Sequence, residues 1–81
     1  MTLEAGMFAK AKAGHDKNCI YVIISVNDEY VYLADGGKRL VSCPKKKNRR
    51  HVQIIYKMQS ASVSEDEMIR MTINEYVELQ K

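Results

Sequence analysis

The sequence is poor in residues that cross-link or interrupt a chain. It has only two cysteines, Cys19 and Cys43, and a single proline, Pro44. Two cysteines are too few for a disulfide framework, so we expect reduced thiols in a cytoplasmic protein. No segment approaches the roughly 20 apolar residues that a membrane span needs, and the start, MTLEAGMFAK, is unlike a signal peptide. With 81 residues the chain corresponds to one small soluble domain.

The motifs of catalysis and of cofactor binding are also missing. No serine stands in a nucleophile-elbow sequence, and there is no glycine-rich phosphate loop. His15, Cys19, Cys43 and His51 form a formal Cys₂His₂ set, but their spacing does not match the paired ligands of zinc modules. We therefore predict a non-enzymatic protein with no metal and no cofactor.

Acidic residues are absent from residues 38–57. Residues 1–37 contribute −2 to the net charge and residues 58–81 contribute −3, whereas this segment contributes +8 to give the total of +3. Such a basic segment between acidic ones is either a solvated lysine-rich loop or an anion-binding surface. If it binds an anion, lysine and arginine indicate the phosphates of a nucleic acid. Its bases are Lys38, Arg39, Lys45, Lys46, Lys47, Arg49, Arg50 and Lys57.

Alternating and β-branched segments predict five short strands joined by tight turns. A strand over 6–14 has one lysine-bearing face, and 19–26 is the most β-prone run. The turns are GHDKN at 14–18, NDE at 27–29 and DGGK at 35–38, and the last predicts a tight hairpin. Pro44 ends the fourth strand because proline has no N–H to donate. The predicted strands are residues 6–14, 19–26, 30–35, 39–43 and 51–57, which fit a small antiparallel barrel.

The side-chain pattern of the two central strands suggests which face is buried. We expect the core face of 19–26 to carry its even-numbered aliphatic residues, and that of 30–35 to carry Val31 and Leu33. Tyr21, Tyr30 and Tyr32 then lie opposite the core. They form either a stacking platform for unpaired bases or a structural surface, through cross-strand aromatic pairing or as a seat for the C-terminal helix, and we favour the structural role. The even-numbered set is Ile20, Val22, Ile24 and Val26.

The pattern changes to helical spacing after residue 63. Ser64 and Glu67 match a capping box, and apolar residues follow at helical intervals. A helix of about 16 residues is marginal alone, so we expect it to dock on the barrel. The predicted organisation is a barrel over 1–57, a linker over 58–63 and an acidic amphipathic helix over 64–81. The spaced residues are Ile69, Ile73, Tyr76, Val77 and Gln80.

Two stretches resemble the KOW domain of bacterial RNA-binding proteins and of a eukaryotic and archaeal large-subunit ribosomal protein family. GMFAKAKAGHDKNCIYVIISV is similar to the strand, turn and hydrophobic strand of the KOW motif. YVYLADGGKRLVSCPKKKNRRHVQ is similar to its continuation, so that the resemblance covers roughly residues 3–55. The family's turn usually ends in glycine where this chain has Asn18, which also tolerates a left-handed backbone.

The resemblance implies a mainly β, SH3-like five-stranded antiparallel barrel with the helix appended, which binds structured, often ribosomal RNA in the cytoplasm. Ribosomal proteins are further possible neighbours, and no membrane is involved. The implied RNA contacts come from two places: His15 and Lys17 of the first turn, and the basic loop. Lys38 and Arg39 belong to the same acid-free segment as the basic loop and are expected to contribute. The basic loop contributes Lys45, Lys46, Lys47, Arg49 and Arg50, and Lys10 and Lys12 can lie beside it.

Two alternatives concern the C-terminal helix. In the first, the protein is an interaction module whose helix docks in a partner's groove through its apolar residues. In the second, the acidic helix folds back over the basic loop and competes with phosphate.

Overall fold

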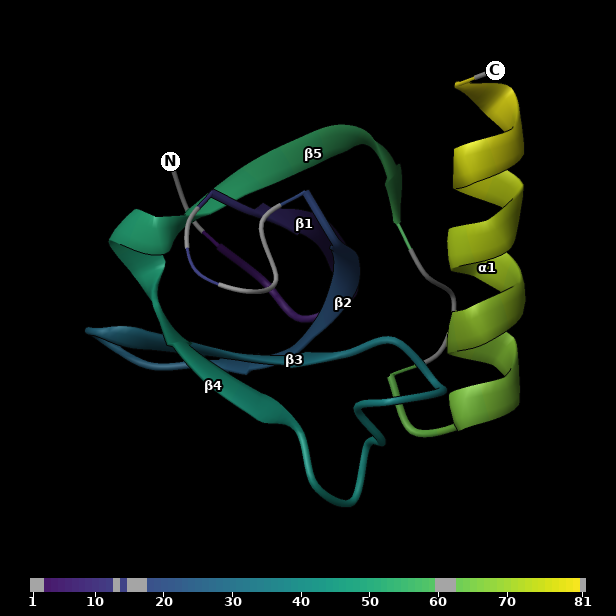
Figure 1. The fold of residues 1–81 in the computed structure, drawn as a ribbon. Helices are drawn as coiled ribbons and strands as arrows, with labels where there is room; N and C mark the ends of the chain where they lie inside the picture. The colour runs from purple at the N-terminus through teal and green to yellow at the C-terminus, as the bar shows by residue number, and fades with distance from the viewer. Residues whose placement is uncertain (1–2, 13, 15–17, 60–62, 81) are drawn as a thin grey trace.

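The computed structural model describes residues 3–12, 14, 18–59 and 63–80. The described strands form one antiparallel sheet in the order β4-β3-β2-β1-β5, which curls around an apolar interior with the helix standing beside it (Figure 1). The elements are β1 (Met7–Ala11), β2 (Ile20–Val26), β3 (Tyr30–Ala34), β4 (Lys45–Asn48), the 3-10 turn η1 (Arg49–His51), β5 (Val52–Gln59) and α1 (Asp66–Leu79).

The predicted fold class is confirmed: a mainly β, SH3-like five-stranded antiparallel barrel followed by a helix. The barrel is not fully closed, because β4 and β5 occupy the two ends of the sheet order and are joined only by η1 among the described residues. No helix in the described part of the chain is long and apolar enough to cross a membrane.

Strand β2 is buried on both faces. Tyr21 and Ile23 point into the barrel, where they pack with Val31 and Leu33 of β3. Val22 points the other way and packs with residues of α1. A strand covered on both sides needs apolar residues at every position, which explains why CIYVIISV reads as a nearly continuous apolar run.

The expected core face of β2 was therefore wrong in part. Val22 is buried, but Ile20, Ile24 and Val26 are only partly buried, and Ile20 and Ile24 pack on the helix side. Tyr21 is 3% exposed inside the barrel, so it offers no stacking surface. In β3 the prediction is confirmed, since Val31 and Leu33 face inward.

The connection between β3 and β4 differs from the expected hairpin and fourth strand. Residues 39–43 form no strand, and β4 begins after Pro44, in the segment expected to be a basic loop. Asp35 shapes the connection, because its Oδ1 accepts hydrogen bonds from the N–H groups of Gly37 (2.8 Å) and Arg39 (2.9 Å). Farther along, the N–H of Val41 donates to Asp66 Oδ1 of the helix at 2.7 Å. The segment is thus used to hold α1 rather than to extend the sheet.

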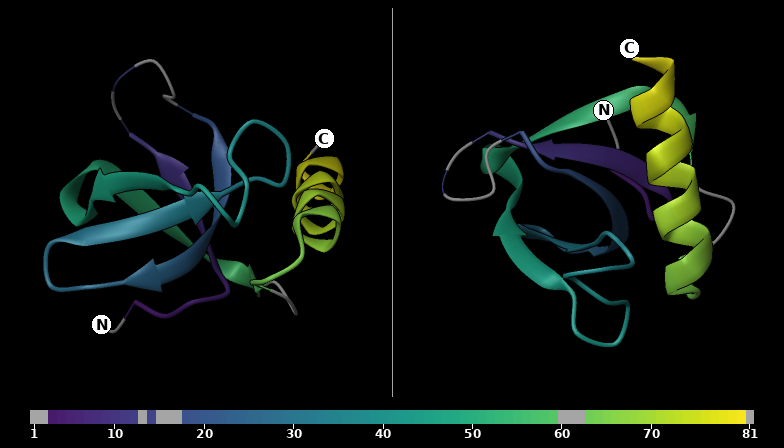
Figure 2. Two further views of the ribbon diagram at one scale, coloured as in Figure 1. Left: turned by 90° about the horizontal axis from the view of Figure 1, so that it is seen from below. Right: turned by 45° about the vertical axis from the view of Figure 1, so that its right-hand side comes forward.

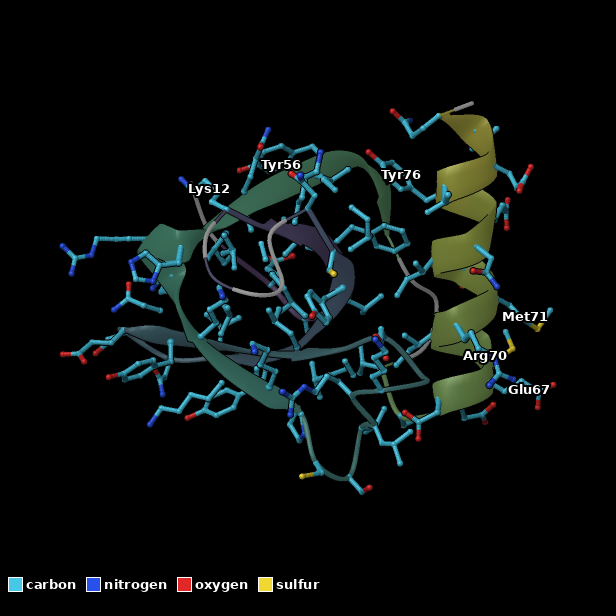
Figure 3. All side chains as sticks on the ribbon, in the orientation of Figure 1. Lys12, Tyr56, Glu67, Arg70, Met71 and Tyr76 are labelled. Carbon is cyan, nitrogen blue, oxygen red and sulfur yellow. The ribbon has the colours of Figure 1, made fainter. Side chains whose placement is uncertain are left out.

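The helix docks on the barrel as expected. Ile69 and Ile73 are buried against β1, β2 and β3, and burial of such side chains contributes about 1.5–3 kcal/mol each. Tyr76 extends toward the barrel and meets the ring of Phe8 edge to face, with centroids 5.6 Å apart (Figure 3).

The boundaries near the C-terminus need correction. The helix begins after Glu65, one residue later than a cap at Ser64 implies, and Glu65 makes no side-chain capping bond. The last strand continues to Gln59, two residues into the expected linker.

Gly36 is where the helix touches the β3–β4 connection most closely. Its φ of 78° is in the left-handed region. A Cβ built there would lie 2.9 Å from both the backbone N and the Cβ of Arg70, and closer still to the backbone carbonyl oxygen of Asp66. Only glycine satisfies both the dihedral angle and the approach.

We predict that Gly36→Ala destabilises the protein by at least about 1–2 kcal/mol, the cost of the left-handed backbone for a residue with a Cβ, with the displaced helix adding to it. The matched control is Gly37→Ala, since a Cβ on Gly37 would meet only Asp35 Oδ1, at 3.7 Å. That variant should stay within about 0.5 kcal/mol of the parent. Urea unfolding followed by circular dichroism measures both, and equal stabilities would show that the contact at Gly36 does not matter.

Candidate nucleic-acid interface

Three consecutive lysines form most of β4, at one edge of the sheet. The register pairs Lys45 with Leu33, Lys46 with Tyr32 and Lys47 with Val31. Residues directly opposite in an antiparallel pair share a face, so Lys45 and Lys47 lie on the side of the barrel interior and Lys46 on the outside. Residues 45–48 of the basic segment thus form a strand with lysines on both faces, and not the loop expected from their charge.

The lysine side chains are positioned by apolar neighbours. Lys45 and Lys47 are half-buried, which fits aliphatic stems that pack on the open edge of the core. On the outer face the Nζ of Lys46 lies 4.2 Å from the centre of the Tyr30 ring, a cation–π contact. Tyr30 therefore orients a lysine.

Gly14, at the start of the first turn, lies close to β4. Lys47 Nζ lies 3.8 Å from the point that a Cβ on Gly14 would occupy. At the other end of the turn, Asn18 has a φ of 73°, which confirms that it takes the left-handed position usually held by glycine. His15 and Lys17, the predicted contacts of this turn, lie outside the described residues.

The short helix η1 extends the basic surface beyond β4. Asn48 starts η1, and its side chain accepts a hydrogen bond from the N–H of Arg50 at 2.9 Å. The N–H of Lys12 donates to the carbonyl oxygen of His51 at 2.8 Å, so the end of β1 lies against η1. Both Lys12 and Arg50 are exposed. The expectation that lysines of the first strand lie beside the basic segment is thus confirmed for Lys12, whereas Lys10 pairs with Ile20 and Gln53. We call Lys12, Lys45, Lys46, Lys47 and Arg50 together the basic edge.

Arg49 has a different role from its neighbours. Its Nη1 donates to the carbonyl oxygens of Asn27 (3.2 Å) and Asp28 (3.3 Å), and its N–H donates to Glu29 (3.0 Å). These bonds fasten η1 to the β2–β3 turn, which Asn27 itself closes by accepting from the N–H groups of Glu29 and Tyr30. Arg49 is thus a positioning residue.

Acidic side chains lie close to this end of the basic edge. Asp28 and Glu29 line a shallow cleft of about 320 Å³ together with Asn48, Arg49 and Arg50. Carboxylates repel phosphate, so the potential at Arg50 is less positive than at β4. The charge count of residues 38–57 gave no sign of this, because the acids come from a turn twenty residues earlier.

Lys38 and Arg39 are not part of the basic edge. Both stand in the β3–β4 connection that Asp35 shapes. Lys38 is exposed and lines a cleft beside α1.

The helix packs on the outer face of β1, β2 and β3, away from η1 (Figures 1 and 2). It does not lie over β4 as the masking alternative requires. Ile69 and Ile73, on which the docking alternative relied, are packed in the chain's own core.

Neither any protein-family model nor any curated protein matches this chain. The resemblance to the KOW-domain family therefore stays a prediction carried by the residues quoted above. In the described part of the chain, no three histidine, cysteine, aspartate or glutamate side chains are placed to hold a metal ion.

We predict that Arg49→Ala and Arg50→Ala differ in stability although the residues are adjacent. Removing the Arg49 guanidinium deletes its two side-chain hydrogen bonds to the β2–β3 turn and should cost about 1 kcal/mol. Arg50 is exposed, and its replacement should change the unfolding free energy by less than about 0.5 kcal/mol. Thermal unfolding compares the two; a larger loss for Arg50→Ala would contradict the role given to Arg49.

Proposed function

We propose that the protein is a non-enzymatic RNA-binding protein that holds the phosphate backbone of structured RNA along its basic edge. The observation that carries this proposal is the placement of Lys45, Lys46 and Lys47 on an edge strand, with Lys47 facing the first turn. Lysines that neutralise phosphates release condensed counterions, which drives association without reading sequence.

The geometry favours a duplex or folded RNA as the partner. Successive residues of a strand are about 3.3 Å apart, so alternate lysines lie about 7 Å apart along β4. A rigid row of cations at that spacing suits neighbouring phosphates of a stiff helix better than one small anion. Proteins on A-form RNA recognise shape and backbone through such contacts. The resemblance to the KOW family points the same way, to ribosomal RNA and to ribosomal proteins as neighbours.

A cytoplasmic location forms part of the proposal. Cys19 and Cys43 are both free and exposed, which suits a reducing compartment where ribosomal RNA is found.

The contacts are not shared evenly among the predicted residues. The three lysines of β4 carry most of the affinity, with Lys12 as a further cation beside η1. Arg50 contributes less to the affinity because Asp28 and Glu29 lie beside it. Arg49 contributes indirectly, because it positions η1.

We predict that the affinity for a structured ribosomal-type RNA hairpin falls steeply with salt. With about four phosphate contacts and a slope of about −0.7 to −0.9 for each, the logarithm of the association constant falls by about 3 to 4 per tenfold increase in salt. Fluorescence anisotropy across a salt series measures this. Absence of binding at low salt would overturn the proposal.

The single variants Lys46→Ala and Lys10→Ala provide a matched comparison. Each removes one lysine from a strand, but Lys46 is exposed on β4, whereas Lys10 is half-buried on β1 between Ile20 of β2 and Gln53 of β5. Lys46→Ala should weaken binding and reduce the salt slope by about one contact, roughly 0.7–0.9, whereas Lys10→Ala should leave the slope unchanged. Equal effects would indicate that net charge, and not β4, determines binding.

A further inference from the structure

A second candidate site lies between the helix and the barrel. It is an open cleft of about 480 Å³, within the range of about 300–1,000 Å³ usual for small-ligand sites. The helix contributes Arg70, Ile73, Asn74 and Val77, and they share one face because each lies three or four residues from at least two of the others. The opposite wall comes from the end of the first turn, from Ile20 and from the β3–β4 connection.

The cleft is lined by both apolar and amide side chains. Ile20, Ile73 and Val77 are its apolar residues. The amides of Asn18 and Asn74 can both donate and accept hydrogen bonds.

The cleft also contains two cations and one acid. Lys38 and Arg70 are both exposed, and the acid is Asp35. The Oδ1 of Asp35 already accepts hydrogen bonds from the N–H groups of Gly37 and Arg39. The two cations are thus the groups best placed to meet an anion that enters.

This combination matches the parts of a single nucleotide. The flat face of a base needs an apolar surface, its edge needs groups that donate and accept hydrogen bonds, and its phosphate needs cations. Arg70 is well suited to the phosphate because its guanidinium is a forked donor. The Cβ of Arg70 lies 2.9 Å from the point that a Cβ on Gly36 would occupy, so the base of the side chain is close to the β3–β4 connection.

The first turn connects the cleft to the basic edge. Gly14, near the start of the turn, lies beside Lys47, and Asn18, at its end, lines the cleft. Gly14 and Asn18 are four residues apart and therefore at most about 14 Å from each other, so one RNA molecule can contact both β4 and the cleft.

We propose that the cleft between α1 and the barrel binds one unpaired nucleotide of the RNA whose duplex portion lies on the basic edge. This inference rests on the proposed function and adds to it a preference for RNA with an extruded or bulged nucleotide. Contacts between the duplex and β4 provide affinity that depends on RNA shape, and the cleft distinguishes RNAs with an unpaired nucleotide from fully paired ones.

The test uses two hairpin RNAs that differ only by one bulged nucleotide in the stem. The parent protein should bind the bulged hairpin about tenfold more tightly, the effect of one additional charge-assisted contact. Arg70→Ala should abolish this ratio while leaving the affinity for the fully paired hairpin unchanged. Lys46→Ala should weaken the binding of both hairpins by the same factor and so keep the ratio of their affinities.

Met71→Ala is the control on the helix, since Met71 is adjacent to Arg70, 57% exposed and absent from the cleft lining. It should behave like the parent. Equal affinity of the parent for the two hairpins would overturn the inference and leave the proposed function standing. Failure to bind either hairpin would overturn the proposed function.

The two cysteines give a readout that is independent of affinity. Cys19 lines the cleft, whereas Cys43 lies outside its lining, and both are exposed. In the single-cysteine variant Cys43→Ser, the bulged hairpin should slow alkylation of Cys19 more than the paired hairpin does. In Cys19→Ser, the two hairpins should affect Cys43 equally. A mononucleotide such as adenosine monophosphate should also slow alkylation of Cys19 alone, and this tests the cleft even if neither hairpin binds. No protection of Cys19 by either probe would contradict the site.

Discussion

The fold depends on the burial of β2 from two sides. Its odd-numbered residues Tyr21 and Ile23 are in the barrel, and Val22 needs a cover on the outside, to which α1 contributes Ile69 and Ile73. The helix can take this position because Gly36 admits its backbone and because Asp66 accepts a hydrogen bond from Val41. Those two contacts in turn fix the β3–β4 connection, and with it the point at which the lysine strand begins. Packing on one face of the sheet thereby determines where charge appears on its edge.

The surface chemistry follows from this scaffold and not from charge alone. Two neighbouring arginines, Arg49 and Arg50, differ because one is bonded to the β2–β3 turn and the other is exposed beside acidic side chains. A count of basic residues treats them as equal. The structure separates them and concentrates the positive potential on β4.

The sequence indicated the barrel, the docked helix and the basic segment, because these depend on local pattern and composition. Val31 and Leu33 alternate with tyrosines in a strand with one apolar face, so their burial could be predicted. Tyr21 could not be placed, since a strand buried on both faces has no alternation to interpret. The strand at 45–48 was missed because lysine is a poor strand former, and pairing with β3 overrides that preference. The cleft was not foreseen because its residues come from three separated parts of the chain.

The position of β4 at the edge of the sheet has one more consequence. An exposed edge invites strand pairing between copies of a chain, and lysines on such a strand are a common means of preventing it. In this protein the ammonium groups that are suited to phosphate are also the ones that keep two edges apart. Solubility and affinity for polyanions are therefore set by the same side chains, and neither property can be changed by mutation of β4 without a change in the other.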